Sequence, residues 1–247
     1  MIKNFNHCIK KKDFYMNQPN SMEHAPANNR LVNLKNMYGS FYKVIWKLIL
    51  EKESDEKNIK KGFAMSFAGC REGDGASTMS FNFAAAFSEN TIEPVILVDA
   101  NLRKPILHHQ FQLKNEKGIS DVINGKVGLL DAIKEIKKGT FFFIPAGPES
   151  KNPTSLFSAP VFESILKLLR DMFSLIVFDL PPVLGNPEST LIANKMDGLI
   201  LVLNADVTRW EVARAAKNDL ETADVKILGA ILNKKEFVIP QAIYKWL

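Results

Sequence analysis

The chain has 247 residues, of which 46% are hydrophobic and 24% are charged. This composition supports one large α/β domain or two small ones, and it excludes a wholly disordered protein. No apolar run approaches the roughly 20 residues of a membrane-spanning helix, and the first residues lack the apolar core of a secretory signal, so we expect a cytoplasmic protein. The two cysteines exclude a disulfide framework, and the four histidines lack the spacing of zinc ligands.

The N-terminal segment carries much of the net charge of +5, because six basic and two acidic residues precede residue 37. Residues 1–30 show no hydrophobic periodicity, so we predict a disordered basic tail. Such a tail is either a solvated, mobile end or a contact for anionic lipid or nucleic acid. Apolar residues then recur at helical spacing, which predicts an amphipathic helix and a charged linker over residues 31–60.

From residue 61 onward, short apolar runs alternate with helical patterns. The runs that we interpret as strands are 63–68, 95–100, 141–146, 175–180, 199–204 and 225–233, and the clearest helices between them are 77–89, 161–172 and 209–222. The runs are continuously apolar, as in strands that helices cover on both faces. Repeated strand–helix–strand units require right-handed parallel crossovers. We therefore predict a single α/β domain over residues 61–247, with a doubly wound, mostly parallel sheet flanked by helices.

A glycine-rich loop, GCREGDGAST, joins the first strand to the helix after it. This arrangement presents free backbone amides and the positive end of a helix dipole, as in the P-loops of nucleotide-binding proteins. Gly73, Gly75, Ser77 and Thr78 fit the P-loop pattern, but Ala76 occupies the position of its lysine. That ammonium normally stabilises the β- and γ-phosphates, so its loss affects catalysis more than binding through the backbone. From the loop alone, a phosphate cradle and an ordinary turn remain equally open.

Two other features of the loop bear on ligand binding. The Ser77 hydroxyl is a candidate ligand for Mg²⁺. Arg71 lies where P-loop ATPases of the partition type carry an extra lysine, and we hypothesise that it supplies the missing charge. The alternative is that Arg71 points to solvent.

Two aspartates, Asp99 and Asp179, each end an apolar run. In open α/β sheets, ligands bind beyond the carboxyl ends of the strands, and a carboxylate there can hold Mg²⁺ or its waters beside a P-loop. One such residue is equally well explained as a cap of the next turn. Two of them, after a glycine loop, favour a nucleotide site.

Five segments in order resemble the cytoplasmic kinase domain of the bacterial tyrosine kinases of capsule and exopolysaccharide synthesis, the BY-kinases. The segments are VDANLRKP (98–105), LHHQFQLKNEKGISDVINGK (107–126), FIPAGPESKNPTSLFSAPVF (143–162), FDLPPVL (178–184) and GAILN (229–233). The resemblance covers residues from about 60 to 233. A looser resemblance extends to the partition ATPases, which share the sheet and the P-loop.

The resemblance implies a P-loop NTPase-like fold with an ATP·Mg²⁺ site. The implied cofactor-binding residues are Gly73, Asp74, Gly75, Ala76, Ser77 and Thr78, joined by Arg103 and, at the adenine, Asn233. The implied metal ligands are Ser77, Asp99 and Asp179, and the two aspartates are also the implied catalytic residues. Family members phosphorylate tyrosines in C-terminal tails and are switched on by a membrane-embedded partner that controls polysaccharide chain length.

The chain departs from the family at several positions. Besides Ala76, Asn101 replaces an aspartate that is a candidate base for the tyrosine hydroxyl, and an amide cannot accept that proton at neutral pH. The tyrosine-rich tail is reduced to Tyr244. The charged residues of the family's oligomerisation helix are replaced as well, by Ser40, Lys43 and Trp46. We therefore predict weak or lost phosphoryl transfer, and if activity survives it is that of a non-specific protein-tyrosine kinase.

The leading hypothesis is an ATP- and Mg²⁺-binding protein that regulates polysaccharide polymerisation or export with a membrane chain-length or export protein. It would lie at the cytoplasmic side of the inner membrane through that partner, without nucleic acid, and the choice between a monomer and a homo-oligomer stays open. The alternative is a partition-type ATPase that dimerises with ATP on membrane or DNA, which Arg71 and the basic tail support. A scaffold with an empty loop is the third hypothesis.

Overall fold

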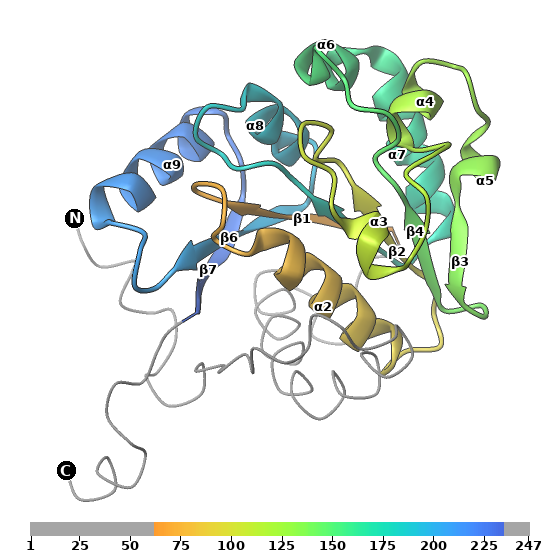
Figure 1. Ribbon diagram of the computed structural model, residues 1–247, viewed down its shortest axis with the longest axis horizontal. Coiled ribbons are helices and arrows are strands. Elements are labelled where there is room, and N and C mark those ends of the chain that lie inside the picture. Colours follow the sequence, from red (N-terminus) through yellow and green to blue (C-terminus); the bar gives the residue numbers. More distant parts are fainter. Residues whose placement is uncertain (1–61, 235–247) are drawn as a thin grey trace, which may run out of the picture.

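Seven strands form one sheet in the order β3-β4-β2-β5-β1-β6-β7 (Figure 1). The computed structural model describes residues 62–234, in which the strands are β1 (Phe63–Gly69), β2 (Val95–Asp99), β3 (Lys134–Lys137), β4 (Phe141–Ile144), β5 (Leu175–Asp179), β6 (Gly198–Asn204) and β7 (Ile227–Asn233). Neighbouring strands are parallel, except that β3 runs antiparallel to β4. The predicted doubly wound, mostly parallel sheet is confirmed.

The strand β3 is an element that the sequence patterns missed. Its residues KEIK alternate between half-buried and exposed side chains at the edge of the sheet. A four-residue edge strand with three charged residues and one apolar residue does not stand out from a loop in the sequence. The other six strands lie where the continuous apolar runs predicted them.

Helices cover both faces of the sheet (Figure 1). The helix α2 (Ala76–Ser88) packs on one face, and α7 (Pro160–Met172), α8 (Pro187–Asn194) and α9 (Trp210–Thr222) contribute to the core on the other. The shorter helices are α3 (Leu107–Gln110), α4 (Ile119–Ile123), α5 (Leu129–Ala132) and α6 (Pro153–Ser158). The three 13-residue helices α2, α7 and α9 confirm the helical periodicity of the sequence.

The central strand β1 explains why the strands are apolar throughout. Phe63, Met65 and Phe67 pack in the core beneath α2, whereas Ala64 and Ala68 belong to the core on the opposite face. Every residue of β1 is buried. A strand between two helical layers has no solvent-facing side, so polar alternation is absent.

The domain boundaries predicted for the N-terminal part lie outside the described residues. This holds for the basic tail (1–30), for the helix and linker (31–60) with Ser40, Lys43 and Trp46, and for Tyr244 near the other end. Of the predicted domain over 61–247, the structure describes residues 62–234. None of the helices in this range is both long and apolar enough to cross a bilayer.

Candidate nucleotide-binding site

The glycine loop connects β1 to the start of α2 at the carboxyl edge of the sheet (Figure 1). Gly73 and Gly75 have φ angles of 85° and 92°, in the left-handed region that glycine tolerates. Gly75 is also the N-cap of α2, and a Cβ there would lie 2.2 Å from the amide nitrogen Nδ2 of Asn233. No side chain caps this helix, and its first turn contains no acidic residue. The first amides of α2 therefore remain available to an anion.

The side chain of Asp74 holds the loop in shape. Its Oδ2 accepts hydrogen bonds from the backbone amides of Cys70 (2.8 Å) and Arg71 (2.9 Å), and its Oδ1 accepts one from the Thr208 hydroxyl (2.8 Å). The carboxylate is buried and fully engaged within the protein. The backbone amide and carbonyl oxygen of Asp74 also have partners, in Arg71 and Asn233, and its contact with a nucleotide stays a prediction.

Asn233, which ends β7, also packs against the loop. Its Nδ2 donates to the carbonyl oxygen of Asp74 (2.9 Å), and its Oδ1 accepts from the backbone amide of Lys234 (2.9 Å). An amide nitrogen carries two protons, so one donor of Asn233 is not used by this contact. The adenine contact that the sequence assigned to this residue stays a prediction.

Asp99 and Asp179 lie directly beside each other, because they are register partners at the ends of β2 and β5. Both are completely buried. The oxygens of Asp99 accept backbone hydrogen bonds from Asn101 (3.1 Å) and Leu107 (3.3 Å). Neither oxygen of Asp179 has a hydrogen-bond partner in the described part of the chain. A buried carboxylate without partners is rare in native proteins and indicates a site for a ligand or ion.

Burial raises the pKa values of both carboxyl groups. The pKa of Asp179 rises from 3.8 to about 7. The hydroxyls of Ser77 and Ser80 lie close enough to lower it in part, but neither makes a hydrogen bond of good geometry to the carboxylate, and that of Ser80 donates to the carbonyl oxygen of Ser77 at 3.0 Å. The pKa of Asp99 is raised well above its ordinary value by burial and by the charge of Asp179, against the lowering effect of its backbone hydrogen bonds. Burial disfavours the ionised form of both carboxyl groups, and a bound cation would stabilise that form.

The donors at this edge fit Mg²⁺. It prefers oxygen ligands and usually combines one or two carboxylates with water and phosphate oxygens. Asp179 supplies a carboxylate without partners, Asp99 a second one, and Ser77 a hydroxyl on the adjacent turn of α2. Residues 62–234 contain no cluster of three or more acidic, histidine or cysteine side chains that would enclose an ion. The two carboxylates and the hydroxyl are too few to fill the coordination shell of Mg²⁺, and water and phosphate oxygens would complete it.

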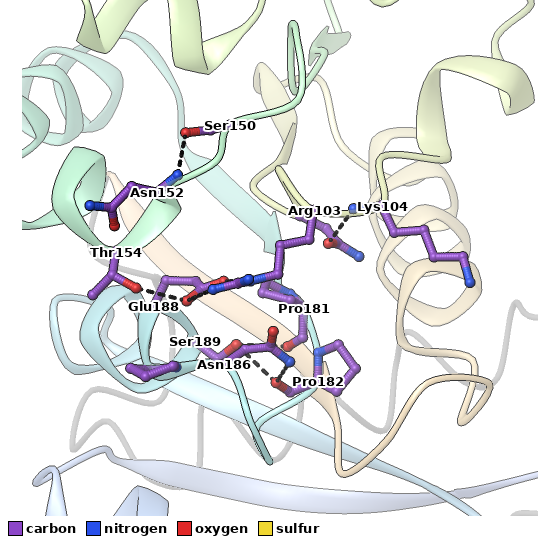
Figure 2. Close-up of polar contacts among 12 residues, drawn as sticks. Arg103, Lys104, Ser150, Asn152, Thr154, Pro181, Pro182, Asn186, Glu188 and Ser189 are labelled. Atoms are coloured by element: carbon purple, nitrogen blue, oxygen red, sulfur yellow. Dashed lines mark hydrogen bonds and ion pairs between the residues drawn. The ribbon is translucent and has the colours of Figure 1, made fainter.

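Arg103 does not join these groups. Its guanidinium pairs with the buried carboxylate of Glu188, in the first turn of α8 (Figure 2). The Thr154 hydroxyl donates to the same carboxylate at 3.0 Å. Sequence analysis assigned Arg103 to the nucleotide and missed Glu188, because a single glutamate in the first turn of a helix is also a common dipole partner.

The segment after Asp179 is held by α8 as well. Ser189 donates to the carbonyl oxygen of Pro181 at 2.8 Å, and Asn186 donates to that of Pro182 at 2.9 Å (Figure 2). Asn101 accepts a hydrogen bond from the backbone amide of Lys104 at 3.1 Å. The structure therefore brings together the glycine loop, Asp99 and Asp179, while Arg71 and Thr78 lie on exposed positions of the same loop and helix.

Several curated proteins that the chain matches are bacterial tyrosine kinases. The chain is 32% identical to the tyrosine-protein kinase YwqD of Bacillus subtilis over 164 residues, which cover 66% of this chain and 69% of YwqD. It is 30% identical to the tyrosine-protein kinase CpsD of Streptococcus agalactiae, over 71% of this chain and 75% of CpsD. The chain belongs to the bacterial tyrosine-protein kinase family. No family model matches it.

Solved structures agree with this assignment. The VpsO kinase domain superposes with a TM-score of 0.71 at 27% identity, covering 86% of this chain and all of VpsO's. The kinase domain of Escherichia coli Etk gives 0.74 at 20% identity, over 97% of this chain and 91% of that one. MinD of Pyrococcus horikoshii, solved with Mg-ADP, shares the fold more distantly, with a TM-score of 0.59 at 22% identity over 74% and 76% of the two chains.

Proposed function

We propose that this tyrosine-kinase family member binds ATP and Mg²⁺ and regulates the polymerisation or export of a capsular or extracellular polysaccharide with a membrane partner. The observation that carries the proposal is Asp179, a buried carboxylate without partners in the described residues, beside a helix α2 whose N-terminus has no side-chain cap. The relatives named as tyrosine-protein kinases support the cofactor, and the pathway is what the motif resemblance to the capsule and exopolysaccharide kinases implies.

Each part of the site has a separate role in this proposal. The loop from Gly73 to Thr78 holds the phosphates through its amides, and Ser77, Asp99 and Asp179 hold the metal. Mg²⁺ offsets the negative charge of the phosphates when it is bound. The raised pKa of Asp179 keeps the empty site partly protonated near neutral pH, so metal binding releases a proton.

Phosphoryl transfer is weak or lost in this proposal. Ala76 supplies no ammonium to the phosphates, and the Asn101 amide, which already accepts a hydrogen bond from the amide of Lys104, cannot take a proton from a tyrosine. ATP then acts by differential binding, stabilising one partner-bound or oligomeric state over another. The protein would act at the cytoplasmic side of the inner membrane, held there by its partner.

Nucleotide titration tests the binding step. We expect a fluorescent ATP analogue to bind only with Mg²⁺, and Asp179→Asn to weaken this binding by roughly tenfold or more. Asp171→Asn, an exposed carboxylate on α7, is the control and should leave the affinity unchanged. If the wild-type protein shows no Mg²⁺-dependent binding at high micromolar nucleotide, the scaffold hypothesis stands instead.

Incubation with labelled ATP tests the loss of kinase activity. We expect little or no phosphotyrosine. Strong phosphorylation that disappears in Asp179→Ala would show that the site still transfers phosphate.

The alternative function is a partition-type ATPase, which the shared fold of MinD keeps open. It requires ATP-dependent dimerisation on lipid vesicles or DNA. Sedimentation with and without ATP distinguishes the two functions, because the proposed regulator needs its protein partner to reach the membrane.

A further inference from the structure

The side chain of Lys234, the last residue that the structure describes, contacts the glycine loop. It directly follows β7, and its Nζ donates a hydrogen bond of 2.9 Å to the carbonyl oxygen of Gly73. Its Cε lies 3.8 Å from where a Cβ on Gly75 would stand. The Lys234 ammonium therefore lies against the glycine loop, in which Ala76 occupies the position of the P-loop lysine.

The position of Lys234 is fixed by the residue before it. Asn233 pairs with Asn204 in the register of β6 and β7, and its amide nitrogen donates to the loop at Asp74. The Asn233 Oδ1 in turn accepts from the Lys234 backbone amide at 2.9 Å. Lys234 has a φ of 57°, a left-handed conformation that is uncommon outside glycine and asparagine. The chain thus turns sharply back towards the loop at this residue.

The ammonium of Lys234 has donors left for a ligand. It carries three protons, and the contact with Gly73 uses one of them. Its side chain is exposed, and it forms no ion pair with a carboxylate of residues 62–234. A phosphate bound on the loop amides would therefore meet a cation that no acidic group has neutralised.

Other cations near the site are less suited to this role. Arg103 is paired with Glu188, and the Lys104 ammonium with Glu72 at 3.0 Å. Arg71 is exposed like Lys234, but no hydrogen bond or ion pair with residues 62–234 holds its guanidinium against the loop. We propose that Lys234 is the phosphate-binding cation of this protein and replaces the P-loop lysine that Ala76 has lost. This inference rests on the proposed nucleotide site.

Nucleotide affinity measured by calorimetry tests the proposal. We expect Lys234→Met to weaken binding of Mg·ATP by roughly 10- to 100-fold, with a larger loss at low salt than at high salt. Lys234→Arg keeps the charge and should retain most of the affinity. Lys138→Met is the matched control, because this exposed lysine lies in the turn before β4, across the sheet from β7. Arg71→Met should cost less than Lys234→Met.

Restoring the lost lysine gives a second, independent measurement. Ala76→Lys should raise the affinity, and in that background Lys234→Met should have a much smaller effect than in the wild-type chain, since the two cations serve the same phosphates. Equal effects in both backgrounds would overturn the proposal, as would an unchanged dissociation constant for Lys234→Met. Thermal unfolding of each variant without nucleotide shows whether the fold is intact.

The two proposals fail in different ways. A wild-type protein that does not bind Mg·ATP contradicts the nucleotide site and this inference together. If the wild-type protein binds Mg·ATP and the affinities of Lys234→Met and Lys138→Met are the same, only the role of Lys234 is contradicted.

Discussion

The glycine loop and the acidic strand ends beside it differ in how their polar groups are satisfied. In the loop, the carboxylate of Asp74 accepts three hydrogen bonds, and the side chains of Thr208, Asn233 and Lys234 donate to loop atoms. At the strand ends, Asp179 has no partner among the described residues. The Asp74 carboxylate therefore has all its hydrogen bonds within the protein, whereas the Asp179 carboxylate has none with residues 62–234.

This difference distinguishes residues that stabilise the structure of the site from residues that are available to bind a ligand. A side chain whose bonds are all internal contributes to folding, so its loss lowers the free energy of unfolding. A buried charge without partners disfavours folding and favours whatever neutralises it. Substitutions in the two regions should therefore change stability in opposite directions.

Asp74→Ala is expected to have the largest effect. It leaves two backbone amides and a hydroxyl without their acceptor, so we expect the free energy of unfolding to fall by about 3 kcal/mol. Urea denaturation without nucleotide measures this loss. The control is Glu72→Ala, an exposed carboxylate on the same loop whose ion pair with Lys104 should contribute less than about 1 kcal/mol. Equal losses in both variants would contradict the bracing role of Asp74.

Asp179→Asn should act in the opposite direction at high pH. The carboxyl group has a pKa of about 7 in the folded protein and near 3.8 when unfolded, so the folded state keeps its proton longer. The free energy of unfolding therefore decreases as pH rises from about 4 to 7. We expect Asp179→Asn to reduce this decrease and to be more stable than wild type at pH 8, by on the order of 2 kcal/mol.

Urea denaturation at several pH values between 5 and 8, without Mg²⁺, tests this prediction. Part of the pH dependence should persist in the variant, because the pKa of Asp99 is also raised. Asp171→Asn on α7 provides the matched control, with the wild-type pH dependence. A variant less stable than wild type at pH 8 would mean that the Asp179 charge is stabilised in the empty protein.

Sequence patterns were sufficient for the parallel part of the sheet and for the residues at the ends of its strands, but not for the edge strand β3. Continuous apolar runs located six strands and put Asp99 and Asp179 at strand ends, whereas the order of the strands, which makes the two aspartates neighbours, comes from the structure. They could not predict which polar groups would be satisfied, because that depends on partners far away in the chain. Thr208 lies 134 residues from Asp74, and Glu188 lies 85 residues from Arg103. Lys234, next to the predicted Asn233, was overlooked because no motif includes it.

The pair of Arg103 and Glu188 should give the smallest effect and a characteristic pH dependence. Burial raises the pKa of Glu188, but the hydrogen bonds from Arg103 and Thr154 and the Arg103 charge outweigh it, so the pKa is lowered. Since the pKa in the folded state lies below its ordinary value of 4.5, the stabilisation is present above that pH and is lost as the pH falls through the folded value. Arg103→Met should therefore reduce stability by about 1 kcal/mol at pH 7 and by less at pH 4.

Denaturation of Arg103→Met at both pH values distinguishes a charge effect from lost packing of the arginine stem. The neighbouring Lys104→Met removes an exposed ion pair and should change stability by less than about 0.5 kcal/mol at either pH. If the loss in Arg103→Met is the same at pH 7 and pH 4, the methylene groups of Arg103 contribute the stability and its charge does not. Arg103 would then have a guanidinium that the fold does not need, and its assignment to the nucleotide phosphates would regain support against the structural role.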